Sequence, residues 1–286
     1  MEPEPEPDGH EPSSENELDT PTSEDLDRLF GSDSGSDDDD ELLLLGPTLY
    51  QLRHAGLTPE FVSQAYRMPT AIRDLLVEGA DPSSVAPSAV LDSLQMTGPE
   101  RAAAEAEARC DLASAMLCQP HTLSAEACAR LRDAVDAGLH NGEQCRGRDS
   151  VDHATEFQLN VTVAELAAII GQDSVANLRL VAEDFVESAW DEEAQVFVRR
   201  YSGDSRPWIP FHTDTARVTL NVSLSDEAAI DGGELMVLAE GRVVALKREE
   251  GEATVHSSEL MHAVARVSSA VRYSLIIFCG LALDEC

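Results

Sequence analysis

The last third of the chain carries the pattern that most restricts its fold. Turn residues such as Asp231-Gly232-Gly233 and Glu250-Gly251 separate a series of short segments, each of them β-branched or alternating. These segments are 196–201, 217–224, 234–238, 242–247, 253–255 and 271–279. Many short strands joined by turns are typical of an antiparallel sandwich or barrel, where each strand finds a hydrogen-bonding neighbour. The sequence therefore predicts a β domain at this end.

Helical patterns precede this β region. Gly and Pro separate short candidates at 59–68, 70–78 and 87–96, and the Ala- and Glu-rich stretch 100–117 predicts one longer helix. Ser124 can cap a helix whose apolar residues recur at positions 127, 131, 135 and 139. Two more helices are predicted at 163–170 and 174–190. The expected fold class is α+β.

Acidic residues are concentrated at the start of the chain. The 286 residues include 54 Asp and Glu against 20 Lys and Arg, a formal net charge of −34. Residues 1–41 alone hold 17 acidic residues and one basic residue, Arg28. Such a segment repels itself and has too little apolar surface to offset its ordering entropy. We expect it to be a disordered tail. The four leucines at 42–45 that follow it are expected to pack, with a docking motif as the alternative.

The charge also bears on partners and location. Nucleic acid and anionic membranes both require clustered Lys and Arg, and Lys247 is the only lysine. No run of about 18 apolar residues suggests a membrane span, and the acidic start lacks the features of a secretory signal. The six cysteines show no CxxC pair. We expect no nucleic-acid or membrane partner, and a cytoplasmic or nuclear location.

A candidate metal site lies inside the β region. Residues i and i+2 of an extended segment point to the same side, so His212 and Asp214 can face one cation. A third ligand must come from another strand, and both His256 and His262 are available. Two histidines and one carboxylate leave three positions open on an octahedral iron, the geometry that non-haem Fe(II) oxygenases use. The residues alone leave both histidines as candidates.

Arg272 lies ten residues beyond His262, in an apolar segment. A buried arginine requires an anionic partner, and its planar guanidinium suits a bidentate contact with a carboxylate. Ser274 faces the same side of the strand and can donate a second hydrogen bond. The alternative is a structural ion pair with one of the many acidic residues.

These features occur together in a specific order. It runs 201–203 (YSG), 210–214 (PFHTD), 231–235 (DGGEL), Gly251, 262–264 (HAV) and 272–274 (RYS). The stretch resembles the 2-oxoglutarate- and Fe(II)-dependent dioxygenase superfamily, and within it the prolyl 4-hydroxylase-like catalytic domain. The chain departs from the usual family pattern at Ala270, where glycine is common, and at Trp208, often a tyrosine or another aromatic residue.

The resemblance implies a double-stranded β-helix, a jelly-roll or cupin-like core with packing helices before it. The implied organisation is a disordered acidic tail at 1–41, a helical segment of unknown role at 42–114 and a dioxygenase domain at 115–282. By the same resemblance, the residues His212, Asp214 and His262 bind Fe(II) and are catalytic. Arg272 and Tyr201 bind the co-substrate 2-oxoglutarate, with Ser274 as a further contact.

The implied reaction uses O₂ and 2-oxoglutarate to hydroxylate a substrate, with release of succinate and CO₂ and with ascorbate as reductant. Asp214 favours hydroxylation, because related halogenases lack this carboxylate. A peptidyl proline is the first substrate to consider, although a peptide, a protein or a small molecule all remain open. The rival interpretation is a non-catalytic interaction protein that acts through its acidic tail and helical segment. A cupin-like metalloenzyme without 2-oxoglutarate leaves Arg272 unexplained.

Overall fold

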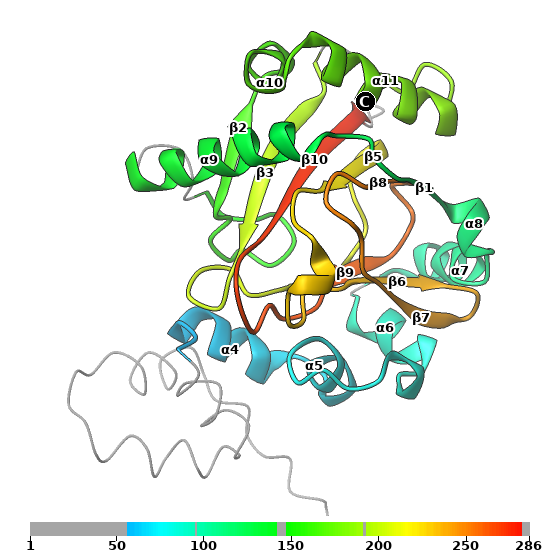
Figure 1. Cartoon of the computed structure of the whole chain (residues 1–286). Coiled ribbons are helices and arrows are strands. Elements are labelled where there is room, and N and C mark those ends of the chain that lie inside the picture. Colours follow the sequence, from blue (N-terminus) through cyan, green and yellow to red (C-terminus); the bar gives the residue numbers. More distant parts are fainter. Residues whose placement is uncertain (1–55, 95, 142–146, 191–192, 282–286) are drawn as a thin grey trace, which may run out of the picture.

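The computed structural model describes residues 56–94, 96–141, 147–190 and 193–281 (Figure 1). The predicted acidic tail at 1–41 and the leucine run at 42–45 lie outside the described residues. In the part of the chain that is described, none of the helices combines the length and apolarity that a bilayer span requires.

Two antiparallel sheets form the centre of the molecule. The larger sheet has the strand order β1-β8-β5-β10-β3-β2 and the smaller one β4-β9-β6-β7. The bounds are β1 Met116–Gln119, β2 Gln158–Val161, β3 Gln195–Tyr201, β4 Ile209–His212, β5 Ala216–Ser223, β6 Leu235–Ala239, β7 Arg242–Leu246, β8 Ala253–Ser257, β9 His262–Val264 and β10 Arg272–Leu281. From β3 to β10 the chain winds back and forth between the sheets, which is the topology of a double-stranded β-helix. The predicted fold class is confirmed.

Three helices cover the outer face of the larger sheet (Figure 1). They are α9 (Ala125–Asn141), α10 (Val163–Ile170) and α11 (Gln172–Phe185). Leu131, Leu166 and Leu178 from these helices pack with Val198 and Ile277 of the sheet in one buried cluster. Because side chains alternate along a strand, the neighbours of Val198 on β3 and of Ile277 on β10 point inward, toward the smaller sheet. On β3 and β10 that inner face carries polar groups.

The helical segment before residue 116 packs against the smaller sheet. It consists of α4 (Pro59–Arg67), α5 (Thr70–Leu76), η1 (Pro82–Ser84), α6 (Pro87–Ser93), α7 (Gly98–Glu107) and α8 (Leu112–Ala115). Phe61 meets the ring of Trp208 edge-on, with the ring centroids 5.3 Å apart. Leu75, Met236 and Met261 belong to the same buried cluster. The segment therefore shares a core with the β-sandwich, whereas its boundaries as a separate domain stay a prediction.

One predicted helix is divided into two in the structure, and the helix expected at 174–190 ends earlier, at Phe185. Instead of a single helix over 100–117, α7 ends at Glu107, and a four-residue helix follows the cap at Asp111. Asp111 accepts a hydrogen bond from the Ala113 amide and so starts a new turn. Met116 then begins β1, which pairs with β8 at the edge of the larger sheet. Tertiary pairing with an open strand outweighed the helix propensity of this Ala-rich sequence.

Candidate metal centre and carboxylate site

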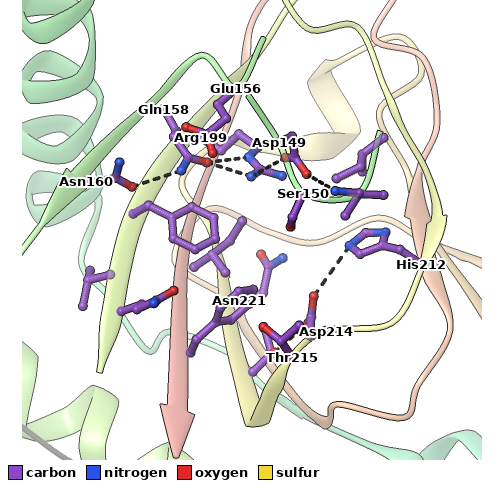
Figure 2. Close-up of a pocket in the computed structure, with 18 of the residues that line it drawn as sticks. Asp149, Ser150, Glu156, Gln158, Asn160, Arg199, His212, Asp214, Thr215 and Asn221 are labelled. Carbon is purple, nitrogen blue, oxygen red and sulfur yellow. Dashed lines mark hydrogen bonds and ion pairs between the residues drawn. The ribbon is translucent and has the colours of Figure 1, made fainter. Parts of the chain in front are cut away.

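A cavity of about 600 Å³ lies between the two sheets, and the three predicted metal ligands are on its wall. His212 ends β4 and His262 begins β9, and the two residues are paired directly across these neighbouring strands. Asp214 follows two residues after His212. Figure 2 shows the His212 ring turned toward the Asp214 carboxylate. Short adjacent strands thus bring together groups that are 50 residues apart in the sequence.

The three candidate ligand groups converge on one region of the cavity wall. One nitrogen from each of His212 and His262 and one carboxylate oxygen of Asp214 all lie within 4.8 Å of one another. His212 Nε2 is 3.6 Å from Asp214 Oδ1, and His262 Nε2 is 3.7 Å from Asp214 Oδ2. Two imidazoles and one carboxylate on one side of a cavity are a donor set that suits divalent iron with open positions.

Backbone carbonyls fix the tautomer of both histidines. His212 Nδ1 donates to the Pro210 carbonyl at 2.9 Å, and His262 Nδ1 donates to the Leu260 carbonyl at 3.0 Å. A carbonyl oxygen only accepts, so the proton resides on Nδ1 and each Nε2 presents its lone pair to the cavity. Burial, and next the nearby His262, lower the pKa of His212 and keep this imidazole neutral.

Asp214 is held as a carboxylate. Thr219, on β5, donates its hydroxyl to Asp214 Oδ2 at 2.6 Å. Burial acts to raise the pKa of Asp214, but the facing His262 and His212 outweigh burial, and the pKa lies below its usual value. The group therefore stays ionised and available to a cation at neutral pH.

His256 lies next to this set but outside it. Its ring is buried on β8, 4.8 Å from the His262 ring centroid, and its Nε2 is 4.0 Å from Asp214 Oδ2. The group of converging ligand atoms includes His262 and leaves His256 out. Of the two candidates for the third ligand, the geometry thus favours His262. Its role as an iron ligand remains a prediction.

The predicted co-substrate residues gather at one end of the inner sheet face. Arg272 and Tyr201 are paired across β10 and β3, and the guanidinium carbon lies 5.0 Å from the centroid of the Tyr201 ring. Ser274 follows two residues later and is fully buried, as is Arg272. Tyr201 also lines the cavity that holds the metal ligands, together with the apolar side chains of Ile209 and Val264.

Arg272 has an internal partner that the sequence did not single out. Glu227 begins the short helix η2 (Glu227–Ala229), and its Oε1 accepts from Arg272 Nε at 3.0 Å and lies 2.8 Å from Arg272 Nη2. A structural ion pair, the alternative for Arg272, is therefore present. It occupies only the Nε side of the guanidinium.

The remaining donors of this cluster lack acceptors. Among the described residues, Arg272 Nη1 and Ser274 Oγ have no hydrogen-bond partner, although both atoms are buried. Leaving buried donors unpaired is costly, by roughly 1–3 kcal/mol each. A ligand carboxylate supplies the acceptor oxygens that these donors lack, so the residues fit the acid end of 2-oxoglutarate.

Another buried arginine, Arg199, does line the cavity, and sequence reasoning missed it. Arg199 on β3 lies 2.8 Å from Asp149 Oδ2 and donates to Gln158 Oε1 at 2.7 and 3.1 Å (Figure 2). Gln158 and Asp149 thereby join one wall of the cavity. The alternation of Phe197, Arg199 and Tyr201 along a predicted strand was the available signal, because it places all three on one face.

No family model matches the chain, and no curated protein matches its sequence. Solved structures do resemble it. A prolyl 4-hydroxylase from Pseudomonas putida has 20% identity and a TM-score of 0.49, over 62% of this chain and 98% of that one. The non-haem alpha-ketoglutarate-dependent epimerase SnoN from nogalamycin biosynthesis has 17% identity and a TM-score of 0.44, over 63% and 84%. A Trichoplax adhaerens prolyl hydroxylase in complex with a hypoxia-inducible-factor peptide has 13% identity and a TM-score of 0.42, over 66% and 95%.

Proposed function

We propose that the chain is a 2-oxoglutarate- and Fe(II)-dependent dioxygenase. One observation supports this most strongly. A cavity wall carries a convergent set of two histidines and one carboxylate, and beside Tyr201, which lines the same cavity, lies the buried Arg272 with a donor that has no acceptor. Either feature by itself is compatible with a protein that binds no 2-oxo acid. Together they match the two ends of a 2-oxo acid that chelates a metal and carries a distal carboxylate.

In this proposal His212, Asp214 and His262 hold Fe(II). When bound, the iron with 2-oxoglutarate and O₂ supplies the oxidant that hydroxylates a carbon of the substrate, and succinate and CO₂ are released. The contribution of the protein is to keep two Nε2 lone pairs and one ionised oxygen aimed at the same point. It also leaves the cavity side of the centre free of further protein ligands among the described residues.

Arg272, Ser274 and Tyr201 hold the co-substrate at the other end. The guanidinium offers the edge that Glu227 leaves free, and the Ser274 hydroxyl adds a donor two residues along the same strand. Apolar side chains of Ile209, Leu235 and Val264 line the part of the cavity near Tyr201 and His262 and make that part of its wall apolar. In such an environment a charge-assisted hydrogen bond is stronger than in water, which favours a single orientation of the bound acid.

The substrate is the finer part of the proposal. The sequence resemblance makes a peptidyl proline the first substrate to test. The cavity is also lined by Phe197 and Phe278, whose rings meet edge-on at 5.3 Å, and by the amides of Asn160 and Asn221. An apolar ring flanked by amide groups suits this lining, and proline in a peptide is such a group.

The test measures succinate released by protein supplied with Fe(II), 2-oxoglutarate, ascorbate and candidate peptides. We expect His262→Ala to abolish turnover and metal binding, because it removes one of three ligands. Arg272→Leu is expected chiefly to raise the KM for 2-oxoglutarate. His140→Ala, an exposed histidine on α9, serves as the matched control and should behave as wild type.

Two results would contradict the assignment. Equal turnover by the His262→Ala variant would remove this residue from the metal site. A wild-type protein whose melting temperature does not change with Mn(II) plus 2-oxoglutarate would favour a non-catalytic interaction protein instead. Binding of Mn(II) is measured without turnover, so this arm does not depend on finding the substrate.

A further inference from the structure

Glu227 lies at the centre of a buried charged cluster that the proposed chemistry does not yet use. It sits between β5 and β6 and is 1% exposed. Its Oε1 accepts from Arg272 Nε, from Arg248 Nη2 at 2.9 Å and from Ser223 Oγ at 3.2 Å. Burial acts to raise the pKa of Glu227, but Arg248 and Arg272 outweigh it and lower the value to about 2. The group is ionised at neutral pH.

Glu227 is itself fixed by the larger sheet. Its Oε2 accepts from the Arg248 amide at 2.9 Å, and its own amide donates back to the Arg248 carbonyl at 3.1 Å. The Arg248 side chain donates to Asn221 Oδ1 on β5 at 3.0 Å and to Thr254 Oγ1 on β8 at 3.1 Å. These hydrogen bonds fix the position of the Glu227 carboxylate independently of Arg272.

The Arg272 side chain has no comparable set of hydrogen bonds to fix its position. Among the described residues Glu227 is the only acceptor that its guanidinium contacts, and the Tyr201 ring lies beside it. A guanidinium has two edges that can bind a carboxylate in bidentate fashion. Glu227 lies against the edge formed by Nε and Nη2. The edge formed by Nη1 and Nη2 is left for a second carboxylate.

We propose that Glu227 is a positioning residue for the co-substrate: by binding one edge of Arg272 it presents the other edge to the distal carboxylate of 2-oxoglutarate. The inference rests on the proposed function and deepens it. The formal charges agree, because one acid and two arginines sum to +1, and a single bound carboxylate neutralises the cluster. Without Glu227, Arg248 would repel Arg272 and move it out of line.

The test compares two ligands rather than turnover. 2-Oxopentanoate has the same chain length as 2-oxoglutarate but lacks the distal carboxylate. We measure both Kd values by calorimetry on Mn(II)-loaded protein and divide the Kd of 2-oxopentanoate by the Kd of 2-oxoglutarate. This ratio reports the contribution of the Arg272 end alone. We expect Glu227→Gln, which keeps the shape, and Glu227→Asp, which keeps the charge but retracts it, to reduce this ratio at least tenfold. The Kd for Mn(II) should stay unchanged in both.

Glu234→Gln is the matched control. Glu234 is a nearby acid in the same connection, paired with Lys247 at 3.2 Å rather than with Arg272, and its loss should leave the ratio as in wild type. A wild-type ratio in Glu227→Asp, or an increased ratio in Glu227→Gln, would mean that Glu227 only balances charge, and the inference would fall. Should Glu227→Gln not fold, Glu227→Asp decides. A wild-type protein that binds both acids equally would overturn the proposed function itself.

Discussion

The imidazole of His256 illustrates what a single buried residue contributes in this interior. It is 1% exposed, and its Nδ1 donates to the Ser257 carbonyl at 2.9 Å. Burial, followed by the charge of His262, lowers its pKa from 6.5 to about 4. Folding therefore requires the neutral form of this side chain. In the unfolded chain the same group takes up a proton near its ordinary pKa.

This difference predicts how stability depends on pH. As the pH falls below 6.5, the unfolded state gains a proton that the folded state does not, so the free energy of unfolding decreases until the pH reaches about 4. The decrease from this residue is at most about 3 kcal/mol. Urea unfolding of metal-free His256→Phe at pH 7 and pH 4.5 should show a smaller decrease than wild type. The exposed control His140→Phe should not. An unchanged pH dependence in His256→Phe would show that the ring is not buried in its neutral form.

Site residues differ in how far the sequence could predict them. His212, Asp214 and His262 have a characteristic spacing, and the structure brings their ligand atoms together as that spacing indicates. Glu227 had no such signal. It is one of many acids in the chain, and its partner Arg272 is 45 residues away. Long-range pairing of a common residue type depends on the path of the backbone, which no local pattern contains.

At two turns, glycine is required because another segment of the backbone lies directly against it. Gly232 has φ +77°, and a Cβ at this position would lie 1.9 Å from the Arg266 carbonyl oxygen. Gly251 has φ +83°, and its Cβ would lie 2.1 Å from the Leu123 carbonyl oxygen. Both turns hold connections of the β-sandwich against another segment. They are two of the turn glycines that separated the predicted strands.

We therefore expect Gly232→Ala and Gly251→Ala each to lower the free energy of unfolding by about 3 kcal/mol or more, since backbone strain and a steric clash add. Gly241→Ala is the matched control. Gly241 also has a positive φ, +68°, but a Cβ there meets nothing within 4 Å. We expect Gly241→Ala to lower the free energy of unfolding by about 1 kcal/mol, from the backbone conformation alone. Urea unfolding measures all three. Similar losses in the three variants would contradict the clash argument.

Most of the long elements followed the sequence pattern. The six predicted strands appear within two residues of their expected ends, and the helix at 163–170 was predicted as observed, with Thr162 and Glu165 forming its capping box. The shortest strands were missed: β1, β2, β4 and β9 have three or four residues each. A strand of this length has too few residues to display an alternation, and it forms because a neighbour supplies hydrogen bonds.

At the scale of the whole molecule, the helices before residue 116 and the β-sandwich share one buried interface. Phe61 on α4 is 1% exposed and contacts Trp208, which is fully buried. Gln64 Nε2, also on α4, donates to Asp152 Oδ2 at 2.8 Å, and Asp152 in turn accepts from Arg206. Apolar and polar contacts both connect α4 to the parts of the chain that contain Asp152 and Trp208. The helices are expected to unfold together with the sheets.

Phe61→Ala tests this coupling. The substitution leaves a cavity in the shared core and should lower the free energy of unfolding by about 3–5 kcal/mol. Urea unfolding followed by tryptophan fluorescence and by far-ultraviolet circular dichroism should still give coincident transitions. Leu180→Ala, at a side chain that is 65% exposed, should change stability by no more than about 0.5 kcal/mol. Separate transitions, with the helical signal lost first, would show two independent units.

Because the chain has a single lysine, proteolysis can report local unfolding next to the Glu227 cluster. A protease specific for lysine has one cleavage site here, the bond between Lys247 and Arg248. The Arg248 amide is hydrogen-bonded to Glu227, and the Arg248 side chain is 2% exposed. The folded protein therefore protects this peptide bond from the protease. Cleavage requires that this segment detach from the sheet. The rate at which one intact chain becomes two fragments therefore measures how often the segment that holds Glu227 detaches, in unlabelled protein and without turnover.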